Sequence, residues 1–149
     1  MTEHSLTHGT FTLERSYPVP PKRVFAAWAD AASKARWFAG PGVEHELDFR
    51  VDGTETVRGR HDGGPLLTFR AHYHDIVPDE RIVYSGTLLA DGRLSTVSVT
   101  SVEFTANGDG TELLLTEHGT YLDNQEQPGM REAGTSAWLD ALTAELQKG

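Results

Sequence analysis

The sequence contains no cysteine. This absence excludes disulfide bonds, cysteine-ligated zinc and a thiol nucleophile. It also fits the reducing cytoplasm, where we expect the protein to be located. The chain likewise has no glycine-rich phosphate loop that opens a helix and no G-x-S-x-G elbow, so it offers no standard signature of a kinase, dehydrogenase or hydrolase. We therefore expect no cofactor.

Long apolar runs and basic clusters are also missing. No apolar run approaches the ~20 residues of a membrane span, and the first residues lack the basic and apolar regions of a secretory signal. The formal net charge is -9, from 13 basic and 22 acidic residues. Because a surface of this sign repels phosphate groups, we expect neither nucleic acid nor an anionic lipid surface as a partner.

The amino-acid composition is typical of a single folded domain. Hydrophobic residues make up 38% and charged residues 23% of the 149 positions, which is ordinary for a globular protein. The length fits one domain with one core. We expect this domain to cover residues 10–148, with residues 1–9 as a flexible tail.

Alternation of apolar and polar residues predicts strands, which prolines and glycines separate. The expected strands are 10–17, 43–49, 55–60, 66–77, 81–89, 94–105 and 111–118. In 94–105 the apolar positions change parity near Thr100 and Ser101, which predicts a β-bulge. Two short helices, 21–29 and 31–38, follow the first strand, and Asp30 is the expected N-cap of the second.

A helical period replaces this alternation from Gln127 to Lys148. Trp138, Leu139, Leu142 and Leu146 form a broad apolar arc, and small residues border it at Gly134, Ala137 and Ala141. Strands followed by one amphipathic helix predict an α+β fold, in which the helix covers one face of an antiparallel sheet.

Several short motifs, in this order along the chain, resemble START-like proteins of the heat-shock-chaperone ATPase-activator-like family. They are Phe25-Ala26-Ala27-Trp28, Arg36-Trp37-Phe38, the turn 48–53 with Asp52 where Gly is usual, the segment 75–84, Gly110-Thr111-Glu112-Leu113, Thr116-Glu117-His118-Gly119, Arg131-Glu132-Ala133-Gly134 and Trp138-Leu139. The resemblance covers roughly Thr10 to Leu146. It implies the helix-grip fold of the START (SRPBCC) superfamily, also known from birch-pollen allergens, in which a curved sheet of six to seven strands wraps around a long C-terminal helix.

The resemblance implies a pocket between the concave face of the sheet and the long helix. The small residues of the helix agree on independent grounds, since they leave volume that a close-packed core would not. The alternative is that bulky sheet residues such as Phe69 fill this space. The expected lining is Phe69, Tyr73, Tyr84, Val99, Leu115, Glu117, Met130, Arg131, Gly134, Ala137 and Trp138.

Glu117 shares a strand face with Leu113 and Leu115 and is therefore expected to point inward. A carboxylate in an apolar pocket needs a partner, and Arg131 at the start of the long helix can supply it. The pair could bind a polar head group, transfer a proton, or only tie the last strand to the helix. His72 and His74 share one strand face, but two ligands are too few for a metal site, and we predict none.

Three functions remain open, because the superfamily includes lipid carriers, polyketide cyclases, co-chaperone domains and hormone receptors. The sequence favours a binding or carrier protein for a small apolar molecule that is lipid-, polyketide- or aromatic-like. The alternatives are a polyketide-cyclase-like enzyme, in which Glu117 moves a proton, and a co-chaperone-type domain that binds a protein partner. Whether any reaction is catalysed stays open.

Overall fold

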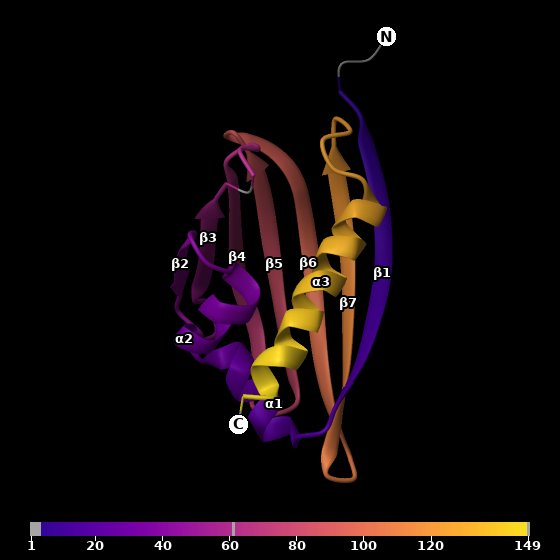
Figure 1. Cartoon of the computed structure of the whole chain (residues 1–149). Coiled ribbons are helices and arrows are strands. Elements are labelled where there is room, and N and C mark those ends of the chain that lie inside the picture. The colour runs from indigo at the N-terminus through magenta and orange to yellow at the C-terminus, as the bar shows by residue number, and fades with distance from the viewer. Residues whose placement is uncertain (1–3, 61, 149) are drawn as a thin grey trace.

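The fold is a curved antiparallel sheet with one long helix across its concave face (Figure 1). The computed structural model describes residues 4–60 and 62–148. The strands are β1 (Leu6–Tyr17), β2 (Glu44–Leu47), β3 (Thr54–Gly59), β4 (Leu67–Val77), β5 (Arg81–Ala90), β6 (Arg93–Asn107) and β7 (Gly110–Leu122). The helices are α1 (Pro21–Ala29), α2 (Ala31–Lys34), the π-helical turn η1 (Ala35–Ala39) and α3 (Pro128–Leu146). This architecture confirms the predicted α+β helix-grip fold.

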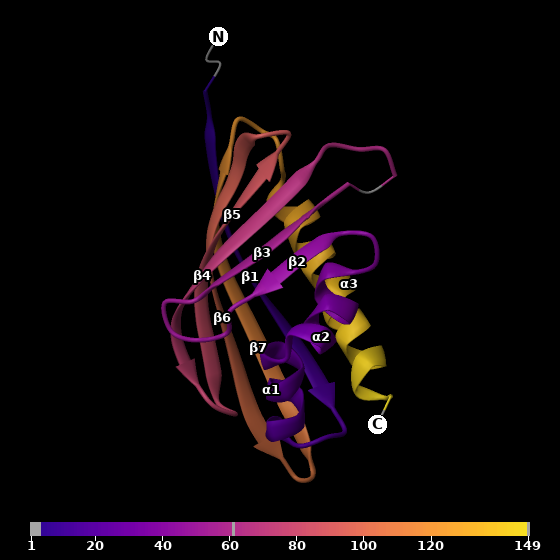
Figure 2. The ribbon, with the colours of Figure 1, turned by 90° about the vertical axis from the view of Figure 1, so that its left-hand side faces the viewer.

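The sheet is a meander from β2 to β7 that β1 extends at one edge, in the order β1-β7-β6-β5-β4-β3-β2. The short helices and α3 lie on the same side of this sheet (Figure 2). β1 begins at Leu6, which pairs with Leu122. Residues 6–9 therefore belong to the sheet, and the prediction that they form part of a flexible tail is wrong. Residues 1–3 lie outside the described part of the chain.

The core lies where the short helices meet α3 and the sheet. Trp28 and Leu142 have no exposed surface, and the rings of Trp28 and Trp37 meet edge to face, with their centroids 4.9 Å apart. The indole nitrogen of Trp37 donates a hydrogen bond to the carbonyl oxygen of Ala27 at 2.9 Å. These contacts hold η1 in place, and η1 supplies one wall of the site described below.

β6 differs from the prediction in its side-chain phase. Its inward residues run without a break from Thr96 through Ser98 and Thr100 to Phe104, so no parity change occurs near Thr100 and Ser101. The register instead shifts opposite Leu88 and Leu89, nearer the hairpin. The prediction failed because the first inward residues of β6 are hydroxyl residues, while its valines at 97 and 99 face outward.

No helix within residues 4–60 and 62–148 combines the length and the apolar character needed to cross a membrane.

Candidate functional site

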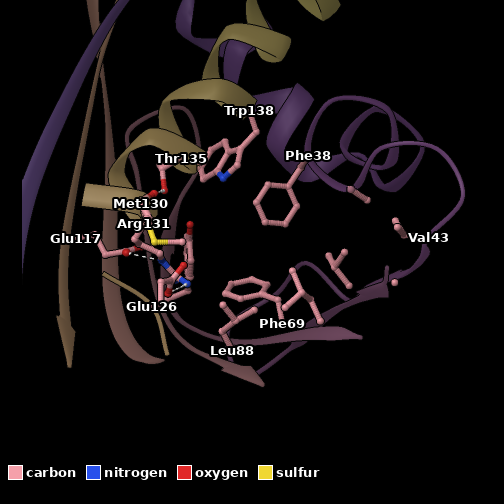
Figure 3. Close-up of a pocket in the computed structure, with 16 residues that line it drawn as sticks. Phe38, Val43, Phe69, Leu88, Glu117, Glu126, Met130, Arg131, Thr135 and Trp138 are labelled. Atoms are coloured by element: carbon pink, nitrogen blue, oxygen red, sulfur yellow. Dashed lines mark hydrogen bonds and ion pairs between the residues drawn. The ribbon is translucent and has the colours of Figure 1, made fainter. Parts of the chain in front are cut away.

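A cavity of about 320 Å³ lies between α3, η1 and the concave face of the sheet (Figure 3). This volume is at the lower end of the ~300–1,000 Å³ that small-molecule sites typically span. Its lining residues are Phe38, Ala39, Val43, Val57, Gly59, Leu67, Phe69, Tyr84, Leu88, Glu117, Glu126, Met130, Arg131, Gly134, Thr135 and Trp138. The helix wall comes from the first half of α3, and the opposite wall comes from β3, β4 and β5.

Aromatic rings from three separate elements form the apolar walls of the cavity. Phe38 of η1 meets Trp138 of α3 edge to face at a centroid distance of 5.0 Å, and it meets Phe69 of β4 at 5.9 Å. Gly86 of β5 makes room for Phe69, because a Cβ atom at Gly86 would lie 2.8 Å from Cε1 of that ring. The missing side chain at Gly86 therefore determines where Phe69 lies.

One end of the cavity is polar and centres on the predicted pair of Glu117 and Arg131. Nε of Arg131 donates to Oε2 of Glu117 at 2.8 Å, and Nη2 donates to Oγ of Ser98 at 3.1 Å. The hydroxyl of Thr100 donates to Oε1 of Glu117 at 2.8 Å. Burial opposes the charged form of Arg131, but the carboxylate of Glu117 raises the pKa of Arg131 above its ordinary value. The structure thus confirms this ion pair.

Glu126 completes the polar end and was missed by sequence reasoning. Its Oε1 lies 3.6 Å from Nη1 of Arg131 and accepts a hydrogen bond from the hydroxyl of Thr96 at 2.6 Å. Figure 3 shows Glu126 beside Arg131 at the edge of the cavity. Glu126 lies between β7 and α3, where neither strand alternation nor helical period can place a side chain. The hydroxyl residues of β6 are the signal that could have indicated a polar end.

The structure brings most of the predicted site residues together. Those that line the cavity are Phe69, Tyr84, Glu117, Met130, Arg131, Gly134 and Trp138. Tyr73 and Leu115 are buried in the neighbouring core and do not line the cavity. Val99 is 47% exposed on the outer face of the sheet, so its predicted inward orientation is wrong.

One residue of α3 that was predicted to line the cavity does not face it. Ala137 is exposed and lies outside the lining, whereas Thr135, which was not predicted, is buried against the cavity. The difference arises because Arg131, Thr135, Leu139 and Leu142 form the inward stripe of α3, about a third of a turn from the row of small residues. Gly134 and Met130 are exposed at the rim.

Several apolar lining residues were missed although they follow ordinary strand alternation. Val57, Leu67 and Leu88 lie on the same sheet face as Phe69, as the strand registers show. Their alternation was visible in the sequence. Phe38, Ala39 and Val43 were not predictable in this way, because they lie in η1 and the following loop rather than in a regular element.

A second polar cluster lies behind the aromatic wall and explains why Tyr73 is absent from the lining. Nζ of Lys34 contacts Oε1 of Glu55 at 2.7 Å and the phenol oxygen of Tyr73 at 3.2 Å. The phenol donates to the same carboxylate oxygen at 3.0 Å, and Nε2 of His45 lies 2.8 Å from Oε2 of Glu55. Tyr73 therefore holds a buried ion pair in place.

Burial acts on both members of this pair. It lowers the pKa of Lys34, and the nearby carboxylate of Glu55 only partly offsets the effect. Burial alone would raise the pKa of Glu55, but Lys34 together with the hydrogen bonds from His45 and Tyr73 brings it below its ordinary value. Glu55 is therefore ionised at neutral pH.

His72 and His74 lie side by side on the outer face of β4. Their rings stack with centroids 4.6 Å apart, and their Nε2 atoms contact Asp52 and Ser85 respectively. In the part of the chain that the structure describes, no three side chains of the types that bind metal come together. This pair therefore offers at most two of the three or four ligands that a metal site needs.

The chain is similar to a known family and to several solved structures. Residues 18–147 match the family described as Activator of Hsp90 ATPase homolog 1-like protein. The structure of the Mll3558 protein from Rhizobium loti is 46% identical, with a TM-score of 0.89 over 95% of this chain and 99% of that one. An uncharacterised protein from Rhizobium leguminosarum is 36% identical, with a TM-score of 0.95 over 99% and 100% of the two chains.

A more distant structure extends the same likeness. The CV1439 protein from Chromobacterium violaceum is 26% identical, with a TM-score of 0.77 over 92% of this chain and 96% of that one. No curated protein matches the chain. The family match covers most of the sequence and the solved structures match it over nearly their whole length, so the predicted resemblance is confirmed. This chain belongs to the family of Activator of Hsp90 ATPase homolog 1-like proteins.

Proposed function

We propose that this protein binds a small, mostly apolar molecule in the cavity between α3 and the sheet, as a carrier or receptor for that molecule. The observation that carries the proposal is the cavity itself, a volume of about 320 Å³ with aromatic walls and one polar end. Protein interiors are otherwise close-packed. Sites for small molecules combine apolar walls with a few placed polar groups in this way.

Binding is better supported than proton transfer. A general base must lie within hydrogen-bond reach of the proton that it removes, and a carboxylate base becomes neutral when it takes that proton up. Both oxygens of Glu117 already accept hydrogen bonds, from Thr100 and from Arg131. A proton taken up by Glu117 would remove the counter-charge of the buried Arg131 guanidinium, so a polyketide-cyclase-like reaction at Glu117 works against this ion pair. The same bonds make Glu117 well suited to hold Arg131 in a fixed position.

A docking role of the co-chaperone type has weaker support. Among the described residues, the large apolar side chains that are exposed are Leu6, Val51, Leu94, Val97, Val99 and Met130. They are spread over the start of β1, the turn after β2, strand β6 and the rim of the cavity. A protein interface concentrates its apolar surface in one patch instead.

The proposal is tested with N-phenyl-1-naphthylamine, a neutral apolar dye whose fluorescence rises in a dry site. We expect saturable binding at one site of the wild-type protein. Gly134→Leu should weaken this binding by about tenfold or more, the equivalent of one to two methylene groups that no longer fit. The reason is that Gly134 lines the cavity and a Cβ atom there meets nothing within 4 Å, so a leucine side chain can enter the space.

Ala137→Leu is the matched control, since Ala137 is exposed on the same helix outside the cavity. This variant should bind the dye as the wild type does. The proposal would be contradicted by the absence of saturable binding to the wild type, or by equal binding to all three proteins.

A further inference from the structure

The charges at the polar end of the cavity do not cancel. Among the described residues, three charged side chains line the cavity, namely Glu117, Glu126 and Arg131. Every nitrogen of the Arg131 guanidinium faces an acceptor, because Nε contacts Glu117, Nη2 contacts Ser98 and Nη1 faces Glu126. One guanidinium therefore serves two carboxylates, and the fixed charge of this end is negative.

Glu126 also has the only carboxylate oxygen at this end without a hydrogen bond inside the described structure. Its Oε1 accepts from Thr96 and faces Arg131, whereas no donor within residues 4–60 and 62–148 bonds to its Oε2. Both oxygens of Glu117 are engaged. A ligand that enters the cavity thus meets a free acceptor oxygen at Glu126, and it meets a guanidinium that is hydrogen-bonded at Nε and Nη2 and lies with Nη1 3.6 Å from Glu126.

The rest of the surroundings favours the same sign of ligand charge. Lys34 lies behind the wall, 4.5 Å from the ring centroid of Phe38, and Glu55 neutralises it at 2.7 Å. Aromatic ring faces attract cations. The guanidinium of Arg131 already lies 6.0 Å from the ring centroid of Phe69, and the ring of Trp138 offers this attraction to a ligand. The net charge of -9 adds a long-range attraction for positive molecules.

From this arrangement we infer the class of ligand: a compact molecule with an apolar, aromatic-sized body and a cationic hydrogen-bond donor, such as a protonated amine. The body lies between Phe38, Phe69 and Trp138, and the donor bonds to Oε2 of Glu126. A carboxylate or fatty acid is disfavoured, because Glu117 and Glu126 already share Arg131, the only arginine among the described residues that line the cavity. This inference rests on the proposed function and names the ligand class for that site.

Three probes with one ring system and different head groups test the inference by calorimetric titration at pH 7. They are 2-naphthylmethylamine, which is a cation at this pH, 2-naphthylmethanol, which is neutral, and 2-naphthoate, which is an anion. We expect the amine to bind the wild type about tenfold or more tightly than the alcohol, as a charge-assisted hydrogen bond would give. The naphthoate should bind most weakly.

Glu126→Gln isolates the proposed contact. Glutamine keeps an oxygen to accept the bond from Thr96 and removes only the negative charge, so the fold should be retained. We expect this variant to lose about tenfold in affinity for the amine while its affinity for the alcohol is unchanged. Glu132→Gln is the control, since Glu132 is exposed on α3 outside the cavity, and it should bind all three probes as the wild type does.

The outcomes separate this inference from the proposed function. Equal affinities for the three probes, or tightest binding of the naphthoate, would overturn the inference and leave the cavity as a binding site. An unchanged preference for the amine in Glu126→Gln would overturn the role of Glu126. Failure of all three probes to bind would overturn both proposals.

Discussion

Nζ of Lys34 lies 2.7 Å from Oε1 of Glu55 where both side chains are only 1% exposed. The pair joins α2 to β3 directly behind the aromatic wall of the cavity. Removing two charges from water costs several kcal/mol for each ion unless close partners compensate. Here Tyr73 and His45 supply additional hydrogen bonds to the carboxylate, so the wall rests on a fully paired polar cluster.

Removal of one partner of this pair should strongly destabilise the protein. We expect Glu55→Gln to lower the free energy of unfolding by about 3–5 kcal/mol at pH 7, because the buried ammonium of Lys34 loses its counter-charge. Urea denaturation measures the change. The double variant Lys34→Met/Glu55→Gln should recover most of the loss, and Glu112→Gln on the exposed side of β7 should change little. A Glu55→Gln protein as stable as the wild type would show that the pair is not formed.

The same pair predicts how stability depends on pH. The pKa of Glu55 is below its ordinary value of 4.5 in the folded protein, so on acidification the unfolded chain takes up this proton first. The stabilisation from Glu55 is therefore complete above pH 4.5 and is lost as the pH falls toward the folded pKa. Thermal unfolding across the acidic range should show a steeper loss for the wild type than for Glu55→Gln. Parallel curves for the two proteins would refute this assignment.

Gly134 should be a position where stability can be gained. It lies inside α3, is exposed, and a Cβ atom there would meet nothing within 4 Å. Glycine in a helix interior is less favourable than alanine by about 0.5–1 kcal/mol. Gly134→Ala should raise the free energy of unfolding by about this amount in a urea titration. A loss of stability would indicate that the space above Gly134 is already filled.

Gly86 controls the volume of the cavity through Phe69. The Cβ atom of Gly86→Ala would lie 2.8 Å from Cε1 of Phe69, so the ring has to move toward the cavity. We expect the affinity for N-phenyl-1-naphthylamine to fall by roughly a factor of ten, since the space for one or two ligand carbons is lost.

Thr87→Ala, which changes the opposite face of the same strand, serves as the control for Gly86→Ala. Strand alternation directs residue 87 away from the cavity. If Gly86→Ala folds normally and binds the dye with unaltered affinity, the position of Phe69 does not limit the space available to the ligand.

The sequence predicted the architecture well, because strand alternation and helical period report directly on which face is buried. The same logic brought Glu117 and Arg131 together, one from the inward face of a strand and the other from the first turn of a helix. It failed for Val99, where apolar character was taken as a sign of burial. In β6 the inward positions hold Thr96, Ser98 and Thr100, which bond to the charged groups of the cavity.

Two important residues could not be found from periodicity. Glu126 lies in the connection between β7 and α3, where side-chain direction depends on the path of a loop. Lys34 ends a helix of four residues, and lysine is rarely buried unless it is paired. Its partner Glu55 is 21 positions away in the chain, so the contact exists only once the sheet has curled around the short helices.

The most direct test of the account is an amide NMR titration of the wild-type protein with N-phenyl-1-naphthylamine. The cavity is the proposed binding site, so the largest shift changes should fall on the lining residues Phe38, Phe69, Met130, Gly134 and Trp138. The outer face of β6, around Val97 and Val99, should stay unchanged. Shift changes that cluster on that outer face, or that leave the amides of the lining residues unchanged, would contradict binding in the cavity.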